Sequence, residues 1–123
     1  MDISALVVKN NKVLLLRSSY QYYWTLPGGY LKVDEDLNES IQREIKEELG
    51  LKVVVDKLLK VRVVPKKPVV DILVLCKIVS GEIKVDGKEI KEAGFFDINN
   101  MPTKDNMPPY QLEYIDLLKE VKV

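Results

Sequence analysis

Residues 37–49 constrain the fold most, because they read as an amphipathic helix whose two ends are both marked. An apolar residue recurs every four positions and gives one stripe for a core. These residues are Leu37, Ile41, Ile45 and Leu49. Asp36 followed by Glu39 is a capping-box pattern, and Gly50 suits the left-handed position just beyond a helix. The segment therefore predicts a helix that begins after Asp36 and ends before Gly50.

Three carboxylates, Glu44, Glu47 and Glu48, crowd one side of this helix. Like charges three or four residues apart repel by about 0.2–0.5 kcal/mol per pair, and the helix dipole disfavours negative charge in the last turn. At about 100° per residue, Glu44 and Glu48 project beside the apolar stripe. Arg43 can reach Glu47 one turn on, but one arginine cannot neutralise three acids. A bound divalent metal would do so, and oxygen ligands of this kind suit Mg²⁺ or Mn²⁺.

The segment around this helix resembles the Nudix box of the Nudix hydrolases at every defining position. With the spacing of that family, the positions are Gly29, Glu35, Arg43, Glu44, Ile45, Glu47, Glu48, Gly50 and Leu51. Residues 24–29, Trp-Thr-Leu-Pro-Gly-Gly, also look like the strand and turn that precede the box in that family. One departure is Asp34, where many members carry glycine, and it concerns the loop more than the activity.

The resemblance implies a hydrolase of phosphoric anhydride bonds that cleaves a nucleoside diphosphate linked to another group. A MutT-like nucleoside triphosphate pyrophosphatase is the first expectation. The alternatives are an ADP-ribose or dinucleoside polyphosphate hydrolase, or a catalytically silent nucleotide-binding module on the same fold. The resemblance also implies the fold class, a Nudix-type α/β/α sandwich with a mixed β-sheet between helices. Residues 1–123 are expected to form a single domain of this kind.

The resemblance further implies roles for the residues of the box. By position, Glu44, Glu47 and Glu48 would ligate Mg²⁺ or Mn²⁺, and the backbone carbonyl of Gly28 would join them. Arg43 would orient these glutamates through charge-assisted hydrogen bonds. Glu44 is the first candidate for the general base and Glu47 the second, so Glu44, Glu47 and Arg43 are the expected catalytic residues. Glu35, at the start of the box, would anchor the loop to the helix.

Three features outside the helix have a functional and an ordinary interpretation. Gly28 and Gly29 either shape a phosphate site that binds substrate or form only a tight turn. The tyrosine cluster Tyr20, Tyr22 and Tyr23 either lines a nucleoside pocket, with Tyr23 as the expected substrate-binding residue, or belongs to a surface loop. Glu89 resembles the additional acid that some family members carry on a later loop, but it also fits a solvated charged hairpin.

Hydrophobic patterning places strands on both sides of the helix. The predicted strands are residues 3–8, 13–17, 24–26, 52–64 as one or two strands, 69–79, 82–85 and 94–96. Residues 65–68, Pro-Lys-Lys-Pro, predict a turn or loop. Pro108 and Pro109 open a last helix. Its expected apolar face is Leu112, Ile115, Leu118 and Val121. Strands before, between and after two helices favour a layered α/β fold.

Composition narrows the remaining possibilities. The chain has 123 residues, 19 basic and 19 acidic side chains and a formal charge of zero, which gives no broad field for nucleic acid. It has no histidine, which excludes His-type zinc sites and His-based catalysis. Its lone cysteine, Cys76, lies in an apolar run and is expected in the core rather than as a nucleophile. Without a membrane span or signal peptide, a cytoplasmic monomer or homodimer that binds a small nucleotide, and no membrane, is expected.

Overall fold

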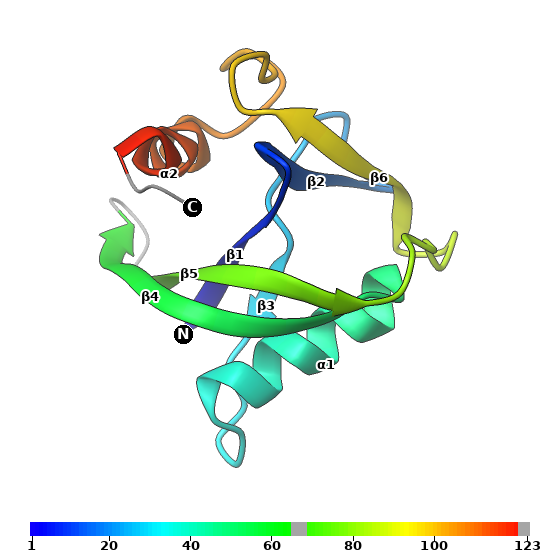
Figure 1. Cartoon of the computed structure of the whole chain (residues 1–123), viewed down its shortest axis with the longest axis vertical. Helices are drawn as coiled ribbons and strands as arrows, with labels where there is room; N and C mark the ends of the chain where they lie inside the picture. The colour runs from blue at the N-terminus through cyan, green and yellow to red at the C-terminus, as the bar shows by residue number, and fades with distance from the viewer. Residues whose placement is uncertain (65–68, 121–123) are drawn as a thin grey trace.

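One mixed β-sheet lies between two helices in the computed structural model, which describes residues 1–64 and 69–120 (Figure 1). The elements are β1 (Asp2–Lys9), β2 (Lys12–Ser18), β3 (Gly28–Tyr30), α1 (Leu37–Leu49), β4 (Lys52–Val64), β5 (Val69–Ser80), β6 (Ile90–Asp97) and α2 (Pro109–Glu120). The strand order is β4-β5-β1-β2-β6, and β3 pairs with the start of β1. Only β1 and β5 run parallel among these pairs. The predicted α/β/α sandwich is confirmed.

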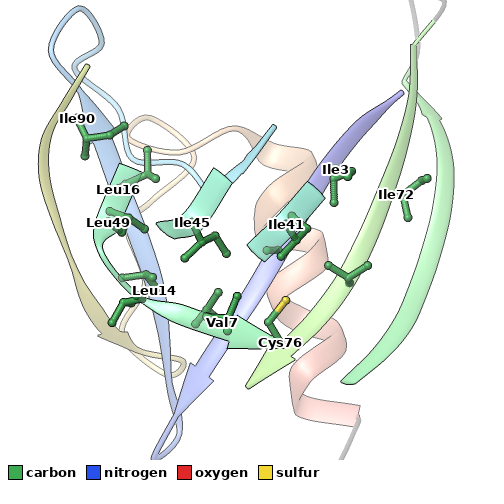
Figure 2. Close-up of a cluster of buried hydrophobic side chains, with 14 residues drawn as sticks. Ile3, Val7, Leu14, Leu16, Ile41, Ile45, Leu49, Ile72, Cys76 and Ile90 are labelled. Carbon is green, nitrogen blue, oxygen red and sulfur yellow. The ribbon is translucent and has the colours of Figure 1, made fainter. Parts of the chain in front are cut away.

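Successive side chains of a strand point to opposite faces of the sheet, and each face carries one apolar cluster. On the α1 face, the helix stripe meets side chains from β1, β2, β5 and β6, as Figure 2 shows. Cys76 belongs to this cluster and is 1% exposed. Burial raises the pKa of its thiol to about 12, so the prediction of a core cysteine holds. On the other face, Leu6, Leu73 and Leu75 pack with Tyr114 and Ile115 of α2.

Both predicted ends of α1 are confirmed. Asp36 has an extended backbone and its Oδ1 accepts a hydrogen bond from the Glu39 N–H at 2.8 Å. Gly50 follows the last turn with a φ of 72°, and its N–H donates to the Lys46 carbonyl at 3.0 Å. A left-handed φ costs glycine little, because it has no Cβ. These two residues therefore fix where α1 begins and ends.

The prediction for residues 24–29 was wrong in its placement of strand and turn. Residues 24–26 contribute only an isolated bridge between Thr25 and Leu16, whereas the two glycines lie inside the strand β3. A Cβ at Gly28 would sit 2.0 Å from the Ile3 carbonyl oxygen. Glycine is needed here for close approach to β1, not for a turn.

The prediction for residues 82–85 was also wrong, because no strand forms there. The Lys84 N–H instead donates to the Leu49 carbonyl at 2.8 Å, which satisfies a free carbonyl at the end of α1. The strand predicted at residues 94–96 is longer than expected. It starts at Ile90, because β6 pairs with β2 along its length.

The last helix was predicted correctly in position, but its buried face is more polar than expected. Ile115 and Leu118 are buried, whereas Leu112 is only partly buried. The remaining buried positions belong to Gln111 and Tyr114. Gln111 accepts a hydrogen bond from the Leu26 N–H, and Tyr114 donates one to Asp71 of β5. Val121 and the predicted turn at residues 65–68 lie outside the described residues. In the described part of the chain, no helix is both long and apolar enough to cross a membrane.

Candidate active site

A cleft of about 300 Å³ opens where β1 and β2 separate. The two strands pair near their hairpin, at Val8 with Val13 and Lys9 with Lys12. Towards the start of β1 its neighbour is β3 instead. The cleft is lined by residues of β1, β2, β3, β5 and both helices. Gly28, Gly29 and Glu48 are in its wall, so it adjoins the acidic side of α1.

Arg43 ties three of the box acids together. Its guanidinium makes a two-point contact with Glu35, at 2.8 Å from Nε and 3.0 Å from Nη2. Its Nη1 contacts Glu44 at 2.9 Å and Glu47 at 3.6 Å. The bond from Arg43 holds the pKa of Glu35 below its usual value. The geometry thus anchors the arginine on Glu35 and leaves its outer nitrogen to orient Glu44.

Gly29 gives Glu44 the space that it occupies. A Cβ at Gly29 would lie 2.6 Å from both Cγ and Cδ of Glu44. Real Cβ atoms do not approach another carbon so closely, so any larger residue would push the carboxylate away. Gly29 is therefore a positioning residue for Glu44.

Glu48 carries a charge that the protein leaves poorly compensated. Burial, followed by the charge of Glu44, raises the pKa of Glu48 to about 7, and Glu89 adds to this effect. Glu89 belongs to a loop fixed by Asp86, whose Oδ1 accepts hydrogen bonds from the N–H groups of residues 88, 89 and 90 at 3.0–3.1 Å. The structure thus brings the exposed Glu89 within electrostatic reach of Glu48, although no hairpin forms.

The donor chemistry fits a hard divalent cation, although no metal cage is preformed. In residues 1–64 and 69–120, no three acidic or cysteine side chains converge as a ready metal site. The Glu47 side chain is 63% exposed and faces Arg43, whereas that of Glu44 is 18% exposed. The negative charges of Glu44 and Glu48 repel each other, and a bound cation would compensate both. Their oxygens suit Mg²⁺ or Mn²⁺ better than zinc.

Replacing Glu48 by glutamine is expected to stabilise the metal-free protein at high pH. The folded pKa of about 7 lies above the usual 4.5, so the wild type loses stability as pH rises through this window. Above pH 7 we expect Glu48→Gln to be more stable than the wild type by about 1–2 kcal/mol. This is less than the full pKa shift would give, because solvent screens a side chain that is only partly buried. Below pH 4.5 both side chains are neutral and the difference should vanish. Urea unfolding in a chelator measures it.

The control for this experiment is Glu39→Gln, at an exposed position in the first turn of the same helix. It should show no such dependence on pH. Equal stability of wild type and Glu48→Gln at pH 8 would contradict the assigned environment of Glu48.

The tyrosine predicted to bind the nucleoside lies elsewhere. Tyr23 packs edge-on against Tyr22, with ring centroids 5.3 Å apart. Both line a separate hollow of about 160 Å³ with Pro108 and Pro109. It is Tyr20 that lines the main cleft. The predicted tyrosine cluster therefore contributes to the cleft, but through a different member.

Sequence reasoning missed the buried polar residues that line the cleft. Ser4, Ser18, Asp71 and Gln111 are buried and line the cleft. One signal for Asp71 was present, since an aspartate interrupts the apolar run of β5. Buried acids are rare unless they have partners, so such an interruption indicates a polar site.

Comparison with known proteins agrees with this geometry. The family model described as NUDIX domain matches residues 2–118. A protein of Methanocaldococcus jannaschii named ADP-ribose pyrophosphatase is 36% identical over 107 residues, which are 81% of this chain and 63% of that protein. The crystal structure of a UDP-X diphosphatase superposes with a TM-score of 0.81 and 29% identity, and covers 98% of this chain and 62% of that one.

An ADP-ribose pyrophosphatase of Streptococcus suis is similar over nearly its whole length. It has a TM-score of 0.78 and 25% identity, with 99% of this chain and 92% of that one covered. By contrast, the chain spans about three fifths of the M. jannaschii protein and of the UDP-X diphosphatase. The match of the family model over nearly all of the sequence, together with the complete box from Gly29 to Leu51, shows that this chain belongs to the NUDIX domain family.

Proposed function

We propose that this protein is a Mg²⁺-dependent pyrophosphohydrolase that cleaves nucleoside diphosphate derivatives. One observation carries the proposal: the acids of the box stand beside a cleft large enough for part of a nucleotide. Glu48 lines this cleft, and Glu44 is held next to Gly29 in its wall. The names of the relatives, all hydrolases of diphosphate bonds, support the same reaction class.

The residues of the site divide the work between metal binding and proton transfer. Glu44, Glu47 and Glu48, with the carbonyl of Gly28, would hold Mg²⁺. When bound, the ion would neutralise charge on the diphosphate and lower the pKa of a water molecule. Glu47 is exposed and would need only a change of rotamer to approach the other two. This is the kind of rearrangement that side chains make on binding.

Glu44 is our first candidate to accept the proton of the attacking water, because Arg43 fixes its orientation. Glu47 is the second candidate. Glu89, on the loop that faces Glu48, is the third. A proton that reaches any of these carboxylates leaves hydroxide to attack phosphorus, and the P–O bond to the leaving phosphate breaks. Positioning and charge compensation do most of this work in phosphoryl transfer.

For the substrate, we place an ADP-ribose-like compound ahead of a nucleoside triphosphate, which reverses the order expected from the sequence alone. Three acids, Asp2, Glu48 and Asp71, line the cleft, and no lysine or arginine does so among the described residues. A triphosphate carries more negative charge than the diphosphate bridge of ADP-ribose, so it would be repelled more strongly. The names of the M. jannaschii and S. suis relatives favour the same choice.

A hydrolysis screen tests this function. The purified protein is incubated with Mg²⁺ and ADP-ribose, nucleoside triphosphates, oxidised triphosphates, dinucleoside polyphosphates or nucleotide sugars, and released nucleotide is measured. We expect ADP-ribose to be the best substrate and a chelator to abolish turnover. A preference for triphosphates would restore the MutT-like assignment. No hydrolysis of any compound would favour a silent nucleotide-binding module.

A further inference from the structure

The part of the cleft farthest from the box is acidic. Asp2 and Asp71 are direct partners across the parallel strands β1 and β5, and both line the cleft. Side chains in register on adjacent strands project to the same face, so these carboxylates lie side by side. Asp71 bonds to α2, whereas Glu48 belongs to α1 on the opposite face of the sheet. The cleft thus has one acidic end on each face.

Asp71 is held as a hydrogen-bond acceptor with capacity left over. The Ser4 hydroxyl donates to it, with its Oγ 3.1 Å from Oδ1 and 3.0 Å from Oδ2. The Tyr114 hydroxyl donates to Oδ2 at 2.7 Å. These two groups supply two protons, whereas a carboxylate has about four acceptor sites. The remaining capacity suits a ligand with N–H groups and disfavours carbonyl oxygens or phosphates.

The walls beside these acids suit a planar ring. Tyr20 and Tyr110 both line the cleft, and the Tyr20 side chain is largely exposed. The Tyr110 hydroxyl accepts a hydrogen bond from Gln111 Nε2 at 3.3 Å. Gln111 in turn is fixed because its Oε1 accepts from the Leu26 N–H at 2.9 Å. The fixed Tyr110 ring and the exposed Tyr20 ring offer aromatic surface on which a nucleobase can stack.

Ser18 gives independent evidence that a ligand completes this cleft. It lies at the irregularity in the pairing of β2 with β6, is 6% exposed and lines the same cleft. Its hydroxyl has no hydrogen-bond partner among the described residues. Ser18 pairs with Ile90 of the α1-face cluster. A buried hydroxyl without a partner is costly, so the α1 side of the cleft, away from Asp2 and Asp71, is where a polar group of the ligand would relieve that cost.

We propose that the Asp2–Asp71 end of the cleft binds the nucleobase of the substrate and selects bases that carry an amino group over uracil. Adenine, guanine and cytosine each present an amino donor to such acceptors. Uracil has no amino group, and its single N3–H lies between two carbonyl oxygens that the carboxylates would repel. This inference rests on the proposed hydrolysis of nucleoside diphosphate derivatives and adds a rule for which nucleoside is accepted.

Pairs of nucleotide sugars that differ only in the base test the rule. With Mg²⁺, kcat/KM is measured for ADP-glucose and UDP-glucose, whose glucose and diphosphate are the same. We expect ADP-glucose to be favoured by at least about 10-fold, because a site with unsatisfied acceptors rejects a ligand that lacks the donor. Equal values, or a preference for UDP-glucose, would overturn the proposal.

Failure of the proposed function remains distinguishable from failure of this rule. If neither sugar nor any compound of the hydrolysis screen is hydrolysed, the hydrolase assignment fails. The selection of the base is then read from equilibrium binding of AMP and UMP to the same protein. Tighter binding of AMP supports the rule, whereas equal affinity or failure of both to bind contradicts it.

Two variants assign the selection to particular carboxylates. Asp71→Asn keeps one oxygen for Ser4 and Tyr114 but turns an NH₂ group towards a ligand, so the preference should fall by about 10-fold. Asp2→Asn changes a less buried side chain, so it tests the same selection even if Asp71→Asn fails to fold. Asp116→Asn, on the exposed side of α2, is the matched control and should keep the wild-type ratio. A ratio unchanged in both cleft variants would refute the assignment.

Discussion

Glu44→Gln and Glu48→Gln should each lower kcat/KM for the best substrate by about 10²–10³-fold while the protein stays folded. The size follows from the loss of one preorganised charge that acts on the transition state. Glutamine keeps the shape of the side chain but cannot carry the negative charge that binds a cation or accepts a proton. Glu44 contacts Arg43 at 2.9 Å, so its replacement should also loosen Glu47. The Glu48 variant should lose activity yet gain stability at pH 8.

Steady-state kinetics at saturating Mg²⁺ measures these effects, and circular dichroism verifies the fold. Glu39→Gln removes a charge from the same helix at an exposed position and should keep at least half of the activity. Titration with Mg²⁺ separates the roles, because a lost ligand raises the concentration of Mg²⁺ needed for half-maximal rate. If either variant retains wild-type turnover with the same metal dependence, that glutamate is not part of the metal site.

Gly28→Ala should destabilise the fold by about 3 kcal/mol or more and abolish activity with it. The added Cβ would lie 2.0 Å from the Ile3 carbonyl oxygen and 3.1 Å from its carbon. Both are backbone atoms of a strand whose side chain at this point is 3% exposed. They cannot move unless β3 separates from β1 and the core opens. Forced overpacking of this kind is among the most costly substitutions.

Gly94→Ala is the matched control, since Gly94 also lies in a strand and a Cβ there meets nothing within 4 Å. It should be neutral or slightly stabilising, because alanine reduces the conformational freedom of the unfolded chain. Urea unfolding of the two variants, analysed with a common dependence of the unfolding free energy on urea concentration, measures the difference in stability. Equal stability of the two variants would show that β3 does not depend on a glycine at position 28.

Local patterns in the sequence were enough to define α1 and its acids. The helix has its apolar stripe, its Asp36 cap and its Gly50 stop within fifteen consecutive residues. Such signals act between near neighbours, so they do not depend on the rest of the fold. The same periodicity predicted that Glu44 and Glu48 would stand beside the buried stripe, and both are partly buried in the structure. The burial of Cys76 followed from its apolar run in the same way.

Long-range contacts decided what the local patterns could not. The glycines of β3 look like a turn in the sequence, and only the approach of Ile3 shows why they form a strand. Asp71 and Asp2 are 69 positions apart and meet because β1 and β5 run parallel. A cleft of this kind is a property of strand pairing, not of any one segment. The sequence by itself thus determined the acidic helix, while tertiary structure determined the cleft beside it, because pairing between distant strands leaves little periodic signal.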